Sequence, residues 1–133
     1  MSSNSSATRA FISPGTNVEN QPFWDGAAAG RFLLKTCKAC GHAHFYPRAI
    51  CPHCFSDQTA WQESAGLGTI YSYSVMRRVE VPYAIAYVTL DEGVTVMSNI
   101  VDADLDKLAI GQRVKVAFRP SEGGVTIPVF TPA

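Results

Sequence analysis

The sequence predicts a mainly β protein with one short N-terminal helix, a cysteine-rich ribbon and a five-stranded barrel. Three observations support this fold class. All four cysteines lie between Arg31 and Cys54, in two C-x-x-C pairs. A short run rich in aromatic residues and alanine precedes them, and alternating β runs separated by turn residues fill the chain from Gly66 onward. We therefore expect a flexible tail over residues 1–20, a helix over 21–30, the ribbon over 31–65 and the barrel over 66–133.

The bulk composition limits the classes to which this chain can belong. Its 133 residues are 47% hydrophobic, which is enough for a core, and 11 basic residues balance 11 acidic ones. This neutral balance argues against a nucleic-acid partner, which clustered Lys and Arg would attract. No apolar run reaches the length of a membrane span, and the Ser- and Asn-rich start lacks the apolar region of a secretory signal. We expect a cytoplasmic protein with neither a nucleic-acid nor a membrane partner.

The run from Asn20 to Gly30, NQPFWDGAAAG, predicts a short helix. A proline stands in its first turn, alanines favour its interior and a glycine can end it. Phe23 and Trp24 share one side with Ala27 and Ala28, on a helix too short to be stable alone. This aromatic face has to pack on something. The alternatives are the chain's own ribbon and barrel, or another protein, since Trp is a favoured interface anchor.

The spacing of the cysteines predicts a metal site. Cys37 and Cys40 form one pair, Cys51 and Cys54 form the other, and the ten residues between them suit two short knuckles facing each other across a hairpin. Gly41 follows the first pair and permits the tight turn of a knuckle. We expect one structural zinc ion per chain, because zinc takes a closed tetrahedral shell of four thiolates. A closed shell leaves no position for a reacting water.

Other interpretations of the cysteines fit less well. A disulfide scaffold is disfavoured because no secretory signal precedes the cysteines. A rubredoxin-type iron centre would use the same ligands, but zinc is the commoner occupant. A redox role for one C-x-x-C pair would not explain why a second pair lies at this spacing. Four thiolates leave no vacancy for a histidine ligand, so we expect the nearby histidines to be exposed loop residues: His42, His44 and His53.

Two short strands are expected to frame the cysteines, one over residues 31–35 and a return strand over 44–50. Apolar residues of the return strand should cover the metal cluster, in a ribbon too small to have another core; they are Phe45, Tyr46 and Ile50. The segment from Arg31 to Cys54 is also basic and contains no acidic residue. Its cations can steady the negatively charged zinc thiolates; they are Arg31, Lys35, Lys38 and Arg48.

From Gly66 onward the sequence predicts five strands and one further short helix. Three strands, a helix and two strands is the order of an OB-fold, a small five-stranded barrel. Tyr71, Tyr73 and Val75 should share one face of the first strand. After the second strand, a three-residue hairpin turn should hold Gly93 in the left-handed conformation. The expected strands are 69–79, 83–90, 94–101, 112–119 and 124–130, and the expected helix is 102–110.

The residues do not indicate catalysis or oligonucleotide binding. OB-folds often bind oligonucleotides on their second and third strands, but the run from Glu80 to Asp106 contains six acidic residues and no Lys or Arg. We recognise no Ser-His-Asp, paired-carboxylate or phosphate-loop arrangement, and we assign no catalytic residue.

The combination of parts resembles a known family. The string QPFWDGAAAGRFLLKTCKACGHAHFYPRAICPHC and the segments GLGTIYSYSVMRR, PYAIAYVTLDEGVTVMSNIV, IGQRVKV and GVTIPVFTPA are similar to OB-fold acyl-CoA-associated proteins with a rubredoxin-like zinc ribbon. The resemblance covers residues 21–133. It implies an accessory subunit, found with thiolase-superfamily enzymes or acyl-CoA aldolases, that is not an enzyme in its own right. The family cysteines map onto Cys37, Cys40, Cys51 and Cys54, and the aromatic helix maps onto Phe23 and Trp24.

From the residues and this resemblance we expect a non-catalytic zinc protein. It would dock on a thiolase-like acyltransferase or an acyl-CoA aldolase and help to bind or channel the acyl-CoA. Phe23 and Trp24 would contact the partner, and Lys38 and Arg48 would attract the anionic CoA phosphates. One alternative is a free-standing OB-fold module that binds CoA esters or single-stranded nucleic acid. Another is an iron-containing electron carrier, which would be coloured when purified.

Overall fold

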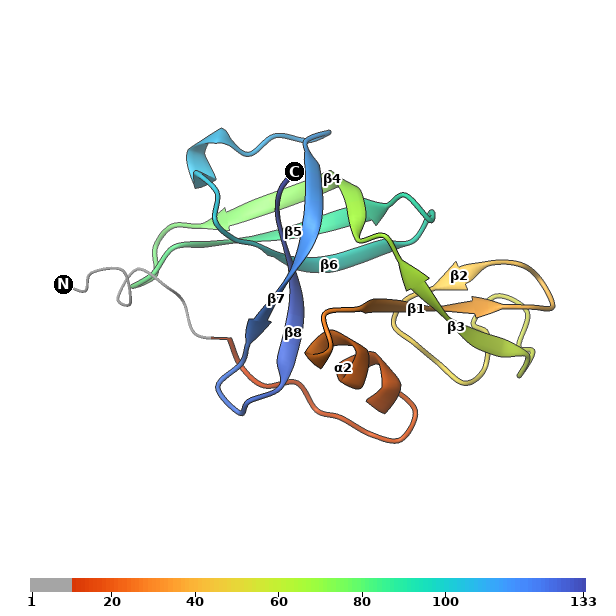
Figure 1. Cartoon of the computed structure of the whole chain (residues 1–133). Helices are drawn as coiled ribbons and strands as arrows, with labels where there is room; N and C mark the ends of the chain where they lie inside the picture. Colours follow the sequence, from red (N-terminus) through yellow and green to blue (C-terminus); the bar gives the residue numbers. More distant parts are fainter. Residues whose placement is uncertain (1–10) are drawn as a thin grey trace.

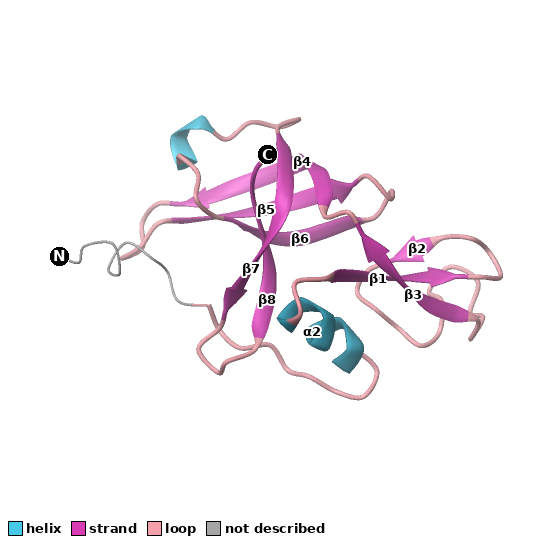
Figure 2. Ribbon diagram, viewed as in Figure 1, coloured by secondary structure: helices cyan, strands magenta, loops and turns pink. Residues whose placement is uncertain are grey.

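The computed structural model describes residues 11–133 and confirms the mainly β fold. Figure 1 shows a small three-stranded sheet beside a closed five-stranded barrel, with the helix α2 (Gln21–Ala28) packed between them. Strands make up most of the regular structure (Figure 2). The first ten residues of the predicted tail lie outside the described residues. Within residues 11–133, no helix is long and apolar enough to cross a membrane.

The chain before α2 is tied to its surroundings by side-chain hydrogen bonds. The backbone N–H of Asn17 donates to Asn20 Oδ1 at 2.8 Å, and the backbone N–H of Asn20 donates to Asn17 Oδ1 at 3.0 Å. The Asn20 Nδ2 also donates to the Tyr46 hydroxyl at 2.5 Å. This reciprocal pair closes the turn that leads into the helix, close to the predicted start of that helix.

One side of α2 is buried in the chain's own core. Phe23 is 1% exposed and Trp24 is 9% exposed. Gly26 and not Ala28 completes this side, because the helix approaches β1 closely: a Cβ on Gly26 would lie 2.8 Å from Leu33 Cδ1. The burial favours the intramolecular alternative for both rings.

The ribbon sheet has the strand order β2-β1-β3. The central strand β1 (Phe32–Cys37) pairs antiparallel with β2 (Ala43–His44) and with β3 (Thr59–Ser64). The return strand predicted over 44–50 is wrong in length, since only two residues pair with β1 before the chain turns toward the helix. β3 was not predicted. Buried and exposed residues do not alternate along it, although it pairs with β1 along the whole length of that strand.

The second unit is the predicted OB-fold barrel. It closes in the order β4-β5-β6-β8-β7, with β7 pairing back onto β4. The pairing of β6 with β8 is parallel and the other pairings are antiparallel. Gly93 has a φ of 95°, as the hairpin prediction required. The strands are β4 (Leu67–Met76), β5 (Tyr83–Leu90), β6 (Thr95–Ile100), β7 (Arg113–Pro120) and β8 (Thr126–Pro132).

The strand β4 contains a bulge at Tyr71, between Ile70 and Ser72. A bulge inserts one extra residue and so shifts the alternation between inward and outward side chains. Ile70 is 1% exposed and packs in the core, whereas Tyr71 is 69% exposed. The predicted shared face of Tyr71, Tyr73 and Val75 is therefore wrong for Tyr71.

The helix predicted over 102–110 is a single 3₁₀ turn, η1 (Leu105–Lys107). Asp104 caps it, and its carboxylate accepts from the backbone N–H of Asp106 at 3.0 Å. Leu108 then returns to an extended conformation and is buried. Asp102 has a φ of 54°, outside the right-handed helical region, so the chain is not helical where the predicted helix begins.

Aromatic rings join the three parts of the molecule into one core. The Phe23 ring lies edge-on to Trp24, Phe45 and Phe32, with centroid distances of 4.8, 5.4 and 6.0 Å. The Phe32 ring in turn lies 6.0 Å from the ring of Phe130 in β8. The helix, the ribbon and the barrel therefore share a continuous apolar cluster.

The residues expected to cover the metal cluster have different surroundings. Phe45 and Tyr46 pack against Phe23 of the helix, with centroid distances of 5.4 and 6.5 Å. Ile50 is 48% exposed, so it does not belong to a buried cover. The apolar residues of the return segment therefore pack on α2, and they do not form a separate core over the cysteines.

Candidate metal centre

The four cysteines lie on two knuckles that have the same backbone hydrogen bonds. In the first, Cys37 N–H donates to His42 O at 2.9 Å and Gly41 N–H donates to Cys37 O at 2.9 Å. In the second, Cys51 N–H donates to Ser56 O at 2.8 Å and Phe55 N–H donates to Cys51 O at 2.9 Å. The repeated pattern presents each C-x-x-C pair to the same point between the knuckles.

The equivalent positions of the two knuckles carry different residues. Gly41 has a φ of 80°, and Phe55 at the matching position has a φ of 65°. Glycine adopts this left-handed conformation freely, whereas a bulky residue is strained there. The Phe55 side chain is 79% exposed, so packing does not explain its presence. Phe55 was not predicted as a functional residue, although the signal is present in the sequence: Gly41 follows the first cysteine pair and Phe55 follows the second.

The sulfur atoms fit a tetrahedral metal ion. All four Sγ atoms lie within 4.8 Å of one another. Cys37 Sγ is 3.6 Å from Cys54 Sγ, and Cys40 Sγ is 3.7 Å from Cys51 Sγ. Zinc bound to thiolates at about 2.3 Å would place neighbouring sulfurs about 3.8 Å apart in a tetrahedron. These distances are too long for disulfides, and the described cysteines are free.

The thiols differ in their affinity for protons. Hydrogen bonds from the backbone N–H groups of Cys40 and Ala39 lower the pKa of Cys37 to about 7. The Ser56 N–H acts to lower the pKa of Cys54, but burial and the neighbouring thiols outweigh it and raise that pKa to about 12. A zinc ion binds thiolates, so binding here releases protons and is favoured as the pH rises.

The histidines do not join the metal ligands. His42 and His53 are exposed, as expected, and their rings lie 5.0 Å apart. His44 is different, because it is only 4% exposed. Burial lowers the pKa of His44, and the neutral ring accepts a hydrogen bond from Arg48 N–H at its Nε2 over 3.3 Å. The prediction of an exposed loop residue is therefore wrong for His44, which holds the loop that leads to the second knuckle.

Two of the four predicted cations are engaged in the ribbon sheet. Arg31 Nε donates to Glu63 of β3 at 3.0 Å. Lys35 is 9% exposed, and its Nζ lies 4.5 Å from the centre of the Trp61 ring. A cation above an indole ring is attracted by its negative face. Arg31, just before β1, and Lys35, within β1, therefore both hold this strand against β3.

The other two cations flank the knuckles. Arg48 Nη1 lies 3.5 Å from Glu19 Oε1, and its guanidinium lies 5.4 Å from the Tyr46 ring centre. The carboxylate of Glu19 also accepts from Ala49 N–H at 2.8 Å, which helps to lower the pKa of Glu19. Lys38 is exposed in the first knuckle and takes part in no ion pair among residues 11–133.

A ribbon with four cysteine ligands, joined to a closed OB-fold barrel, defines the class of this protein. Family models match both parts: "ChsH2, rubredoxin-like zinc ribbon domain" matches residues 24–60, and "ChsH2, C-terminal OB-fold domain" matches residues 61–119. The chain is also 39% identical over 90 residues to the "DUF35 domain-containing scaffold protein" of Methanothermobacter thermautotrophicus. That match covers 62% of this chain and 68% of the relative. The chain belongs to the ChsH2/DUF35 family.

Two further relatives are associated with enzymes. The chain is 34% identical over 125 residues to the "Probable enoyl-CoA hydratase alpha subunit" of Thermomonospora curvata, a match that covers 90% of this chain and 39% of that subunit. The chain thus spans about two fifths of the length of this relative. Among solved structures, a chain of the "Ltp2-ChsH2(DUF35) aldolase" superposes with a TM-score of 0.79 at 34% identity. That superposition covers 90% of this chain and 98% of the other.

Proposed function

We propose that this protein is a non-catalytic zinc-binding subunit that docks on an acyl-CoA enzyme of the aldolase or thiolase type and assists in binding its acyl-CoA substrate. The observation that carries the proposal is the similarity to a chain of the Ltp2-ChsH2(DUF35) aldolase, which extends over 98% of that chain. Names of relatives as scaffold protein and as hydratase alpha subunit are consistent with the same role.

A structural role for zinc follows from the ligand set. Four thiolates complete the tetrahedral shell, so no position is left for a substrate or a reacting water. The two knuckles hold their ligands through backbone hydrogen bonds that a zinc ion would lock together. Zinc bound there would supply folding free energy to the ribbon and shape the surface around it.

The surface that we assign to docking is the outer side of the two knuckles, around Phe55, Ile50 and Lys38. Phe55 is the central residue, because a bulky side chain in a left-handed conformation costs about 1–2 kcal/mol in the isolated chain. Strain of this kind concentrates at functional sites. Ile50 adds exposed apolar surface beside the same cysteine pair, and exposed aromatic residues are common interface anchors.

The basic residues of the ribbon are placed to favour an anionic substrate at this interface. Lys38 is exposed and unpaired among the described residues, so it can approach a CoA phosphate without breaking another contact. Arg48 would have to share its guanidinium with Glu19, from which it lies 3.5 Å. We therefore assign the larger contribution to Lys38 and a smaller one to Arg48.

Co-purification from the native host, with the partner identified by mass, tests the docking role. We expect an acyl-CoA aldolase or thiolase-like enzyme whose turnover depends on this chain. The purified chain should have no turnover of its own. Enzyme-like turnover of acyl-CoA by the isolated chain, or a partner unrelated to acyl-CoA chemistry, would contradict the proposal.

Variants of two exposed aromatic residues locate the surface. Phe55→Ser should weaken the complex by about ten-fold or more, which corresponds to about 1.4 kcal/mol or more. Tyr71→Ser is the matched control, because Tyr71 is similarly exposed but lies on the barrel bulge. Lys38→Glu should raise the partner's Michaelis constant for acyl-CoA while the zinc content stays unchanged. Equal affinities for the two aromatic variants would show that the knuckles are not the docking surface.

A further inference from the structure

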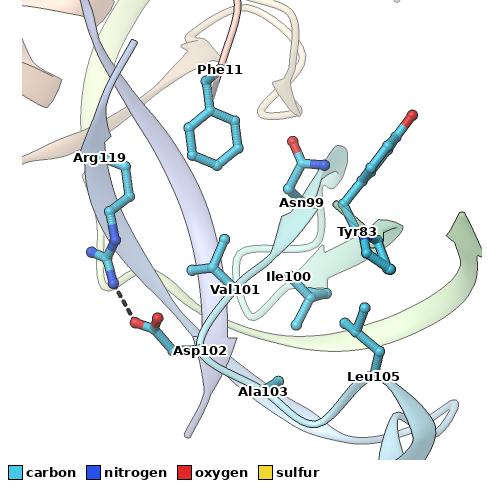
Figure 3. Close-up of a pocket in the computed structure, with 10 residues that line it drawn as sticks. Phe11, Tyr83, Asn99, Ile100, Val101, Asp102, Ala103, Leu105 and Arg119 are labelled. Carbon is cyan, nitrogen blue, oxygen red and sulfur yellow. Dashed lines mark hydrogen bonds and ion pairs between the residues drawn. The ribbon is translucent and has the colours of Figure 1, made fainter. Parts of the chain in front are cut away.

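A cavity of about 310 Å³ opens at one end of the barrel. It lies where β5 begins and β6 ends, and the segments around η1, β7 and the N-terminal chain complete its walls (Figure 3). The opposite ends of β5 and β6 face the ribbon (Figure 1), where Ser64 Oγ donates to Glu92 at 2.9 Å. The cavity is therefore separate from the metal centre. Its volume reaches the lower limit of pockets that hold small organic ligands.

Apolar side chains from three segments surround this space. Val101 follows β6, Leu105 belongs to η1, and Phe11 comes from the N-terminal chain (Figure 3). Ile100, at the end of β6, is 3% exposed and links the cavity to the barrel core. An apolar lining of this kind favours the hydrocarbon part of a ligand.

The wall formed by Phe11 is fixed to the turn between β7 and β8. Glu122 N–H donates to Phe11 O at 2.9 Å, and Gly123 N–H donates to Ser13 Oγ at 2.7 Å. The Ser13 and Ser121 hydroxyls also hydrogen-bond to each other at 2.7 Å. These three hydrogen bonds hold the N-terminal chain in place as one wall of the cavity.

The polar groups at the cavity carry balanced charges. Arg119 on β7 forms an ion pair with Asp102, which Figure 3 shows beside Val101. Asn99 Nδ2 donates to Ala84 O at 3.1 Å, which fixes the amide and leaves its oxygen able to accept a hydrogen bond. These three side chains supply one cationic donor, one anionic acceptor and one neutral amide, so their formal charges cancel.

We propose that this cavity binds a neutral small molecule that has an apolar body and an amide end. The ligand's carbonyl would accept from the guanidinium of Arg119, and its N–H would donate to Asp102 or to Asn99 Oδ1. An amide both donates and accepts, so it satisfies the two halves of the ion pair together. Its apolar body would lie between Phe11, Val101 and Leu105.

Other classes of ligand fit less well. An anion at Arg119 would be repelled by the Asp102 carboxylate, and a cation at Asp102 would be repelled by the Arg119 guanidinium. A plain hydrocarbon would cover the ion pair without supplying any hydrogen bond, which is unfavourable for polar groups. All the residues described as lining the cavity belong to this chain, so binding can be measured on the chain alone.

Titration of the zinc-loaded, ¹⁵N-labelled full chain tests the inference. The probes are N-hexylacetamide, hexanoate and hexylammonium, which differ in charge but have similar apolar bodies. We expect N-hexylacetamide to produce saturable shifts in the amide signals of Asn99, Val101 and Leu105. Hexanoate and hexylammonium should bind about ten-fold more weakly. The absence of saturable shifts at millimolar N-hexylacetamide, or tighter binding of either charged probe, would overturn the proposal.

Two variants and a control identify the site. Val101→Trp fills the cavity and should abolish binding of N-hexylacetamide. Arg119→Met keeps the bulk but removes the donor, and should weaken that binding about ten-fold. Arg113→Met is the matched control, because it removes a second exposed ion pair, with Asp91, elsewhere on the barrel. If Val101→Trp does not fold, Arg119→Met decides the question: affinity equal to that of Arg113→Met would overturn the proposal.

Discussion

The ring of Phe32 in the ribbon lies 6.0 Å from the ring of Phe130 in the barrel, and the two rings meet edge-on. Phe32 is in the strand that leads directly into the first cysteine, and Phe130 pairs with both β6 and β7. This contact therefore joins the metal centre to the closure of the barrel. Edge-on aromatic pairs contribute about 0.5–1.5 kcal/mol beyond the area that they bury. A structural change at the cysteine knuckles should therefore also alter the barrel around Phe130.

Removal of one ligand tests the metal centre. Cys51→Ser should abolish the binding of one zinc per chain, because Cys51 is fully buried among the four sulfurs. We expect loss of the ribbon signals in an amide spectrum and weakened signals around Phe130. His53→Gln is the control and should keep its zinc, since His53 is exposed and is not a ligand in the proposed set. Elemental analysis that finds iron, or a metal-free chain with an unchanged ribbon spectrum, would contradict the assignment.

The buried ring of Phe23 should be essential for stability. Phe23→Ala removes the ring that contacts the helix, the ribbon and, through Phe32, the barrel. The free energy of unfolding should fall by about 3–5 kcal/mol, the usual cost of such a truncation. Ile110→Ala is the control, because Ile110 is 71% exposed, and it should change the free energy by less than about 0.5 kcal/mol. Chemical denaturation of both variants measures the difference.

Relief of strain in the second knuckle should stabilise the chain. Phe55→Gly removes a steric cost of about 1–2 kcal/mol in the left-handed conformation, but the greater freedom of glycine in the unfolded chain offsets about 0.5–1 kcal/mol of it. The free energy of unfolding should therefore rise by about 1 kcal/mol or less. If Phe55 is the docking residue, the same variant should lose affinity for the enzyme partner. Gly41→Phe is the reciprocal test at the matching position and should lower stability. A Phe55→Gly variant that is more stable but binds the enzyme partner with full affinity would show that Phe55 is strained and does not take part in docking.

The contribution of one ion pair should depend on pH. Arg113 donates two hydrogen bonds to Asp91 at 2.8 and 2.9 Å, and these lower the pKa of Asp91 from its ordinary value of 3.8. A carboxylate whose pKa is lower in the fold stabilises the fold above its ordinary pKa and loses that effect as the pH falls through the lowered value. Arg113→Met should therefore reduce the urea midpoint at pH 7 and leave it nearly unchanged at about pH 2.

Salt provides the control for this pair. Both side chains are about half exposed, so the effect of Arg113→Met at neutral pH should be small and should shrink as salt is added. An equal loss at neutral and at acid pH would assign the effect to packing of the arginine stem and not to its charge.

The sequence predicted well those features that depend on local patterns. Turn residues beside the run from Tyr83 to Leu90 predicted the bounds of β5, and the cysteine spacing predicted a ligand set whose sulfurs lie together. Features that depend on the fold were harder to predict. The bulge at Tyr71 shifts the alternation without a glycine to mark it, and β3 is held by pairing with β1 more than by its own pattern.

The candidate metal centre also combines features that a local sequence pattern predicts with features that depend on the fold. The burial of His44 and the pairing of Arg48 with Glu19 both join segments distant in sequence, so no local pattern could predict them. Trp24 was predicted as an interface anchor because Trp is favoured at interfaces, and packing within the chain was the alternative. Here the ribbon and the barrel together provide the surface that covers it.

Closure of the barrel should depend on Gly68. This residue pairs with Leu90 on β5 and with Val114 on β7, so it stands where β4 joins both neighbours. A Cβ at this position would lie 2.7 Å from Val88 Cγ1 and 2.8 Å from Thr89 O. The second contact is with backbone, which cannot move without disturbing the pairing of the strands.

Gly68→Ala should therefore lower the free energy of unfolding by about 1–3 kcal/mol, the usual cost of overpacking a core. Gly15→Ala is the matched control, since a Cβ there meets no atom within 4 Å and its φ lies outside the left-handed region. That control should be neutral or slightly stabilising, because alanine restricts the unfolded chain. Denaturation curves compare the two, and amide exchange should be faster in β4 and β7 of Gly68→Ala. Equal stability of the two variants would mean that β4 can shift to admit the methyl group, and that the close approach at Gly68 is not required for closure.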